Sequence, residues 1–151
     1  MIQYMGLMGH FVGDASQPFH ATVDFDGYGA GHGGIHSYYE EQVVTHFGPE
    51  MEKLIVDKAK TIKDKKLTSG TPIEIMQYLS SLSYKDIEAV LKADPITKKS
   101  EVKNEKGMDI KTAAERSSSE IGYKKFKDLI VLHMARSAVV LSHFWDRSEE
   151  H

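Results

Sequence analysis

Two pairs of residues with metal-binding side chains recur at the same spacing in the first forty residues of this chain. His10 precedes Asp14 by four positions, and His36 precedes Glu40 by the same interval. Residues four positions apart project from one face of an α-helix, one turn apart. Each pair can therefore direct two ligands at one cation, provided that both segments are helical.

A third histidine, His20, lies between the two pairs, after a turn that contains Gln17 and Pro18. Imidazole nitrogen together with carboxylate oxygen is a ligand mixture that zinc accepts. The first pair lies among apolar residues, where an unpaired carboxylate would be costly. No Lys or Arg precedes Lys53, so a metal ion is the simplest cationic partner. The predicted metal ligands are His10, Asp14, His20, His36 and Glu40.

Composition limits the classes of protein that fit. The chain has 151 residues, which predicts one domain over residues 1–151. Its net charge of −3 provides no basic surface for duplex nucleic acid, although bound metals could still attract phosphates. Cysteine is absent, so zinc ligands must be His, Asp or Glu and disulfides cannot form. No segment has the apolar length of a transmembrane helix.

The predicted fold class is all-α, because no segment alternates apolar and polar residues for long enough to indicate a sheet. The ligands belong to helices and a glycine-rich loop within residues 2–47, and the loop itself covers 24–34. Thr71, Pro72 and Glu74 have the spacing of a helix start with a capping box. We expect helices over residues 2–14, 37–47, 50–66, 71–82 and 83–93.

The last third of the chain is predicted to contain a linker and a long helix. Residues 94–109 are polar and rich in Lys, which is typical of a mobile surface linker. Residues 110–147 follow a helical apolar pattern and are expected to form one long helix, or two helices joined near residues 117–119.

The other histidines and short motifs fit ordinary structural roles. His32, in the glycine-rich loop, is an alternative ligand or substrate contact, while His46 is expected in solvent and His133 in the core. The stretch from Asp24 to Gly27 lacks the later oxygen ligands of a calcium loop and is interpreted as a turn. Neither a phosphate-binding loop nor a nucleophile elbow occurs.

Three segments together resemble the zinc-dependent phospholipase C and single-strand-specific nuclease superfamily: HFVGD at residues 10–14, QP at 17–18 before His20, and HSYYE at 36–40. The resemblance covers about residues 4–47. It implies a helical bundle with a three-zinc cluster that hydrolyses phosphodiesters. It also implies that His20, His36 and Glu40 form one complete three-ligand zinc site. His10 and Asp14 would belong to a two-zinc site, with Asp14 bridging its ions.

Members of this superfamily complete the two-zinc site with a Trp, two His and an Asp that precede the first motif. Nine residues precede His10 here, and none is Trp, His or Asp. The resemblance therefore predicts the C-terminal part, or a shortened form, of a zinc phosphodiesterase that is incomplete at its N-terminus. No catalytic residue is assigned, because the usual general-base Asp lies upstream. Secretion is implied if the upstream region encodes a signal peptide.

The function favoured by the resemblance is phosphodiester hydrolysis of the phospholipase C type, with a phospholipid or another phosphodiester as substrate. The nuclease branch typically has Asp where Glu40 ends the second motif, and it uses disulfides. Alternatives left open are a single-strand-specific nuclease, a non-catalytic zinc-binding helical module and a metal-free helical bundle. A homo-oligomer in which a partner chain supplies the missing ligands is a further alternative.

Overall fold

The computed structural model describes residues 2–149, so both ends of the expected domain over residues 1–151 lie outside the described residues. Its α-helices are α1 (Ile2–Ser16), α2 (Ile35–Ser37), α3 (Met51–Thr61), α4 (Pro72–Ala93) and α5 (Ser119–Glu149). Short helical turns are η1 (Pro18–Ala21), η2 (Tyr38–Gln42), η3 (Val44–His46) and η4 (Lys65–Leu67). The strands are β1 (Ile96–Lys98), β2 (Glu101–Glu105), β3 (Met108–Thr112) and β4 (Glu115–Arg116).

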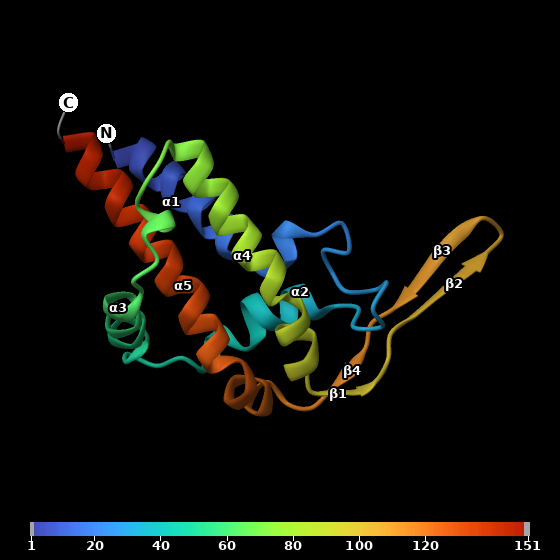
Figure 1. Ribbon diagram of the computed structural model, residues 1–151. Helices are drawn as coiled ribbons and strands as arrows, with labels where there is room; N and C mark the ends of the chain where they lie inside the picture. The colour runs from blue at the N-terminus through green and yellow to red at the C-terminus, as the bar shows by residue number, and fades with distance from the viewer. Residues whose placement is uncertain (1, 150–151) are drawn as a thin grey trace.

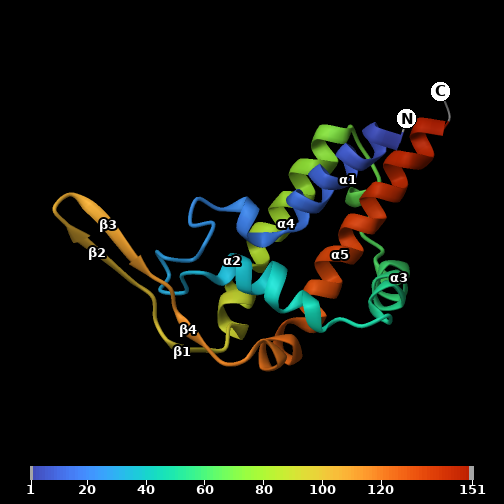
Figure 2. The same ribbon diagram turned by 180° about the vertical axis from the view of Figure 1, so that it is seen from behind.

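Three helices, α1, α4 and α5, lie side by side and form the body of the molecule, with α3 against α5 (Figure 1). The start of α1 and the end of α5 lie at the same end of this body, and strands β2 and β3 extend away from it (Figure 2). The buried apolar residues form two clusters. One joins α1, α4, η4 and α5 through Val12, Leu67, Ile75, Leu79 and Val140. The other joins η1, α2, η2, α4 and α5 through Phe19, Ile35, Tyr38, Tyr39, Val43, Val90, Phe126 and Ile130.

The prediction of an all-α fold is wrong, because residues 96–116 contain two antiparallel two-stranded sheets. β1 pairs with β4, and β2 pairs with β3. The expected linker over 94–109 and the first part of the expected helix over 110–147 are therefore strands. Every residue of β2 and β3 is exposed. β3 alternates apolar and polar residues over only five positions and β2 has a single apolar residue, Val102, so the pattern is too short to indicate a sheet. Lys106 and Gly107 turn the chain with φ of 53° and 78°, as a tight hairpin requires.

Several helix boundaries differ from the prediction: α1 continues to Ser16, the helix expected over 37–47 is divided among α2, η2 and η3, and α3 ends at Thr61. Thr71 and Glu74 cap α4 reciprocally as expected, but α4 then continues without a break through Ser83. The Ser83 hydroxyl is buried and donates to the carbonyl of Ala15 at 2.8 Å, so it ties α4 to α1 and does not begin a new helix. α5 begins only at Ser119. Within residues 2–149, no helix combines the length and the apolar character that crossing a membrane requires.

A chain of buried polar groups links α4 and α5 to η2. The Tyr39 hydroxyl lies 2.8 Å from Nδ1 of His133, and Nε2 of His133 lies 3.1 Å from Oδ2 of Asp86, which Arg136 also contacts. Burial, and to a smaller extent the charge of Asp86, raises the pKa of Tyr39. Because the phenol stays protonated it donates to Nδ1, and Nε2 then donates to Asp86. His133 is 4% exposed, which confirms its predicted place in the core.

We expect Asp86→Asn to lower the free energy of unfolding by about 2 kcal/mol at pH 7, the scale of hydrogen bonds to a charged group. The hydrogen bond from His133, together with the charge and hydrogen bond of Arg136, outweighs burial and lowers the pKa of Asp86. A carboxylate with a lowered folded-state pKa stabilises the protein above its unfolded-state pKa, near 3.8, and loses this contribution as the pH falls through the folded-state value. Urea unfolding from pH 7 to pH 2 measures the difference between the two proteins.

The matched control is Asp57→Asn, which removes an exposed ion pair with Lys60 on α3. We expect this change to alter the stability by less than about 0.5 kcal/mol, because exposed pairs contribute little. A gap between wild type and Asp86→Asn that stays constant down to pH 2 would contradict the assigned role of the carboxylate.

Candidate metal centre

Three of the predicted ligands converge on one point. The ligand atoms of His20, His36 and Glu40 all lie within 4.8 Å of one another. Nε2 of His20 is 3.0 Å from Nε2 of His36, which is 2.7 Å from Oε2 of Glu40. The third distance, from Nε2 of His20 to Oε2 of Glu40, is 3.9 Å. Three electron-pair donors held this closely can bind a metal ion.

Two of these ligands face the same way because the opposite face of their segment is buried. Ile35, Tyr38, Tyr39 and Val43 are each at most 4% exposed and pack against α4 and α5. His36 and Glu40 occupy the remaining face. The segment winds as one π-helical turn, in which the Val43 amide donates to the Tyr38 carbonyl at 3.0 Å. Single π-helical turns are rare and are often found at functional sites.

The third ligand comes from a separate turn, η1, that the predicted Gln-Pro signal begins. Pro18 occupies the first turn of η1, and the Gln17 side chain accepts a hydrogen bond from the Phe19 amide. The amide nitrogen of the same Gln17 side chain donates to Oε2 of Glu40 at 3.1 Å. Gln17 therefore connects the turn that carries His20 with the carboxylate opposite it.

Two aromatic rings lie near the imidazole of His36. The Phe19 ring is stacked at a centroid distance of 6.4 Å, and the Phe25 ring meets it edge-on at 6.3 Å. Phe19 is buried, whereas Phe25 is 58% exposed on the loop that leads to α2. The His36 side chain is 24% exposed, so the centre is open to solvent on one side.

The other two predicted ligands, His10 and Asp14, lie beside this group. Oδ1 of Asp14 is 3.3 Å from Nδ1 of His20, and Oδ2 is 3.3 Å from Nε2 of His10. The Asp14 side chain is 37% exposed, so the expectation of a buried carboxylate in need of a cation is wrong. The apolar residues near Asp14 on α1 do not bury it, because Leu7 and Phe11 are themselves 52% and 56% exposed.

The positions of the donors fit a metal ion. Two nitrogens bound to one zinc at about 2.0–2.1 Å in tetrahedral geometry stand roughly 3.4 Å apart. The separation between the His20 and His36 nitrogens, 3.0 Å, is close to this value, and the distances from Oε2 of Glu40 to the two nitrogens, 2.7 and 3.9 Å, lie on either side of it. Because Nδ1 of His20 faces the Asp14 carboxylate, its Nε2 is free to bind a cation. This arrangement of carboxylate, histidine and metal is common in metalloproteins.

A pocket of about 370 Å³ adjoins the centre between α1 and α5. His10, Asp14 and Glu40 lie on its polar side, and Ile130 and Met134 line it with apolar surface. The pocket has the size and mixed lining of small-molecule sites. Two acids at its edge and no Lys or Arg among its lining residues make this edge negative in the absence of a cation.

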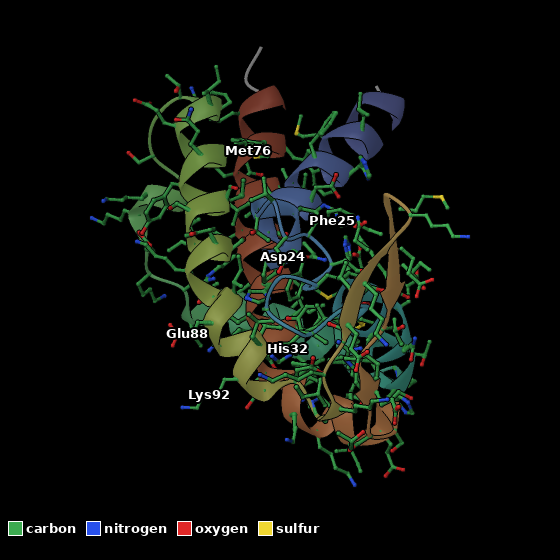
Figure 3. The ribbon with its side chains drawn as sticks, turned by 90° about the vertical axis from the view of Figure 1, so that its right-hand side faces the viewer. Asp24, Phe25, His32, Met76, Glu88 and Lys92 are labelled. Atoms are coloured by element: carbon green, nitrogen blue, oxygen red, sulfur yellow. The ribbon has the colours of Figure 1, made fainter. Side chains whose placement is uncertain are left out.

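Two other histidines have partners that explain them. His32 Nδ1 lies 2.8 Å from Oδ2 of Asp94, beside the end of α4 (Figure 3), and is not among the three grouped ligands. His46 is exposed, as predicted, and its Nε2 lies 2.8 Å from the Ser119 hydroxyl. Sequence reasoning missed Gln17 as a partner of Glu40. The Gln-Pro pair marked the turn but gave no sign of a contact 23 residues away.

Comparison of this chain with models of protein families, with curated proteins and with solved structures finds no match. The resemblance to the zinc-dependent phospholipase C and nuclease superfamily therefore stays a prediction, carried by the residues of three short segments.

We expect Asp14→Asn to weaken binding of a divalent cation to the three-ligand group by about 10- to 100-fold, the usual effect of losing a carboxylate that orients a histidine ligand. Competition with a chromophoric chelator measures the dissociation constant. Asp24→Asn provides the control, because the Asp24 carboxylate accepts hydrogen bonds from the loop amides of Gly29 and Ala30 and is not one of the grouped ligands. Equal affinity in wild type and Asp14→Asn would show that Asp14 does not orient His20.

Proposed function

We propose that this chain is a zinc-dependent phosphodiester hydrolase of the phospholipase C type, or a shortened form of one. The observation that carries the proposal is the convergence of His20, His36 and Glu40 on one point within 4.8 Å. Two neutral imidazoles and one carboxylate are a known ligand set of catalytic zinc, which keeps a fourth position open.

Each neighbouring side chain has a defined task in this proposal. His20, His36 and Glu40 hold the ion, Asp14 keeps the proton of His20 on Nδ1, and Gln17 orients the Glu40 carboxylate. When bound, zinc lowers the pKa of a coordinated water towards about 7 and stabilises charge on phosphate oxygens. The exposed side of the centre admits a substrate from solvent, and the adjoining pocket receives one of its substituents.

Exposed apolar side chains favour a lipid over a nucleic acid as the substrate. Phe11 lies next to His10 with a centroid distance of 5.7 Å, and Phe25 contacts His36, so an exposed ring lies at each end of the line of predicted ligands. Nucleic acids are polyanions that bind through Lys and Arg, and the first 52 residues contain neither. Aromatic rings beside a metal centre suit the apolar part of a phospholipid.

A non-catalytic zinc module is a second candidate. It is favoured by the position of His10, whose side chain is 66% exposed and has Asp14 as its ion-pair partner. Only one group with three ligands is gathered among residues 2–149, whereas the superfamily hydrolyses phosphodiesters with a cluster of three ions. One bound zinc without turnover would fit this alternative.

We expect zinc to bind with a stoichiometry of one per chain, and His36→Ala to weaken binding by more than about 100-fold, beyond the usual effect of an outer-shell change. Zinc should also raise the melting temperature, because a ligand that binds only the folded state stabilises it. Isothermal titration and thermal melts with and without a chelator give both values. His46→Ala is the control, since this histidine is exposed and its Nε2 contacts the Ser119 hydroxyl, which is not part of the three-ligand group.

The outcomes separate the three readings. Zinc binding with chelator-sensitive hydrolysis of a chromogenic phosphodiester supports the hydrolase. Zinc binding without turnover supports the non-catalytic module. A protein that binds no zinc and melts at the same temperature with chelator is a metal-free fold, which removes both zinc proposals.

For the substrate, we expect zinc-loaded protein to hydrolyse phosphatidylcholine vesicles faster than single-stranded DNA. Phe25→Ser should lower the lipid rate severalfold and leave hydrolysis of a small soluble phosphodiester unchanged, because Phe25 is exposed beside the centre and does not bind the ion. Release of phosphocholine and of acid-soluble nucleotides measures the two activities. Preference for single-stranded DNA would favour the nuclease branch.

A further inference from the structure

Arg116, on β4, lies at the centre of a buried polar cluster behind the metal centre. Its Nε donates to Oδ1 of Asp94 at 2.9 Å, and one terminal nitrogen donates to Oδ2 at 3.1 Å. The two side chains are only 7% and 0% exposed. A doubly hydrogen-bonded pair of this kind has a defined geometry that a single point charge cannot reproduce.

The remaining donors of Arg116 bind the backbone just before the ligand His36. One terminal nitrogen donates to the carbonyl of His32, and the other donates to the carbonyl of Gly33 at 3.1 Å and to that of Ala114 at 3.3 Å. The guanidinium has five N–H groups, and these contacts together with Asp94 occupy all of them. These hydrogen bonds account for the burial of the Arg116 guanidinium, because all of its N–H groups have partners.

Arg116 also contacts the segment that connects the ligand His36, on α2, to the ligand Glu40, on η2. The guanidinium carbon lies 5.2 Å above the ring of Tyr38, which stands midway between His36 and Glu40. Tyr38 donates its hydroxyl to the Ser117 or Ser118 carbonyl, each at 3.1 Å. Arg116 therefore holds the residues before His36 and the residue between the ligands at once.

The backbone at this point needs such a restraint. Gly34 begins α2 in the left-handed conformation, with φ of 83°, so small rotations there would swing the whole ligand segment. The glycine-rich loop before it has few buried side chains, and the hairpin base fixes it through amides, such as Ser100 to the Gly31 carbonyl at 2.9 Å. Arg116 and His32 both join this loop to Asp94 at the end of α4, and of the two only Arg116 also binds the loop carbonyls of His32 and Gly33.

We propose that Arg116, together with Asp94, is a positioning pair that sets the direction of α2 and so the placement of His36 and Glu40 in the metal centre. This inference rests on the proposed zinc site. The pair touches no ligand atom. It acts through the carbonyls of His32 and Gly33 and through the ring of Tyr38. The centre therefore depends on a contact made by the strand segment that the sequence analysis took for linker and helix.

The test compares Arg116→Lys with wild type in binding of Zn²⁺ and of Co²⁺ alone. Lys keeps the positive charge but cannot make the two parallel hydrogen bonds of the guanidinium to Asp94. We therefore expect circular dichroism to show a retained fold, while the dissociation constant rises about 10- to 100-fold and the Co²⁺ absorption spectrum changes. Thr71→Ala is the control for destabilisation, because Thr71 caps the N-terminus of α4, at the end of that helix opposite Asp94. It should lower the melting temperature and leave the affinity and the spectrum unchanged.

If Arg116→Lys does not fold, the isosteric Asp94→Asn decides the matter with the same two measurements. Variants that fold and bind both ions as wild type does overturn the inference while leaving the zinc proposal intact. A wild-type protein that binds neither ion overturns the zinc proposal itself. Equal losses of affinity in Arg116→Lys and Thr71→Ala would indicate general destabilisation and would also overturn the positioning role.

Discussion

The candidate metal centre depends on the burial of one face of a short helical segment. Ile35, Tyr38, Tyr39 and Val43 point into the core between α4 and α5. Burying each large apolar side chain contributes about 1.5–3 kcal/mol, so the rotation of the segment about its axis is strongly determined. His36 and Glu40 are then left on the solvent side. A segment too short to be stable alone thus presents two ligands because its other residues are core residues.

Polar contacts refine what burial begins. Gln17 spans from η1 to the Glu40 carboxylate, Asp14 lies against the far nitrogen of His20, and Tyr39 is tied through His133 to Asp86. Each contact joins residues from different parts of the chain. The three-ligand group is therefore connected to several parts of the chain on its protein side and is open to solvent on the other.

Sequence reasoning succeeded where a local rule was sufficient. The spacing of His36 and Glu40, the Gln-Pro turn before His20, and the cap formed by Thr71 and Glu74 are each determined by neighbouring residues. It failed over residues 94–116, because the strands of the exposed hairpin are five residues long and only β3 alternates apolar and polar residues, which is too short a signal among many Lys and Glu residues. It also failed for Asp14, since the apolar residues around that carboxylate remain partly exposed and the carboxylate is not buried with them.

By itself the sequence determined which residue types could bind a cation, and at which spacing, because helical geometry relates positions four apart without reference to the rest of the chain. Spacing alone left open which pair His20 joins; the resemblance placed it with His36 and Glu40, and the tertiary structure brings these three together. Only the tertiary structure shows that Gln17 contacts Glu40 and that Arg116 and Asp94 hold the loop before His36. These are contacts between residues distant along the chain, and they depend on how the helices and strands pack. That packing follows from the burial of the two apolar clusters, which no local pattern specifies.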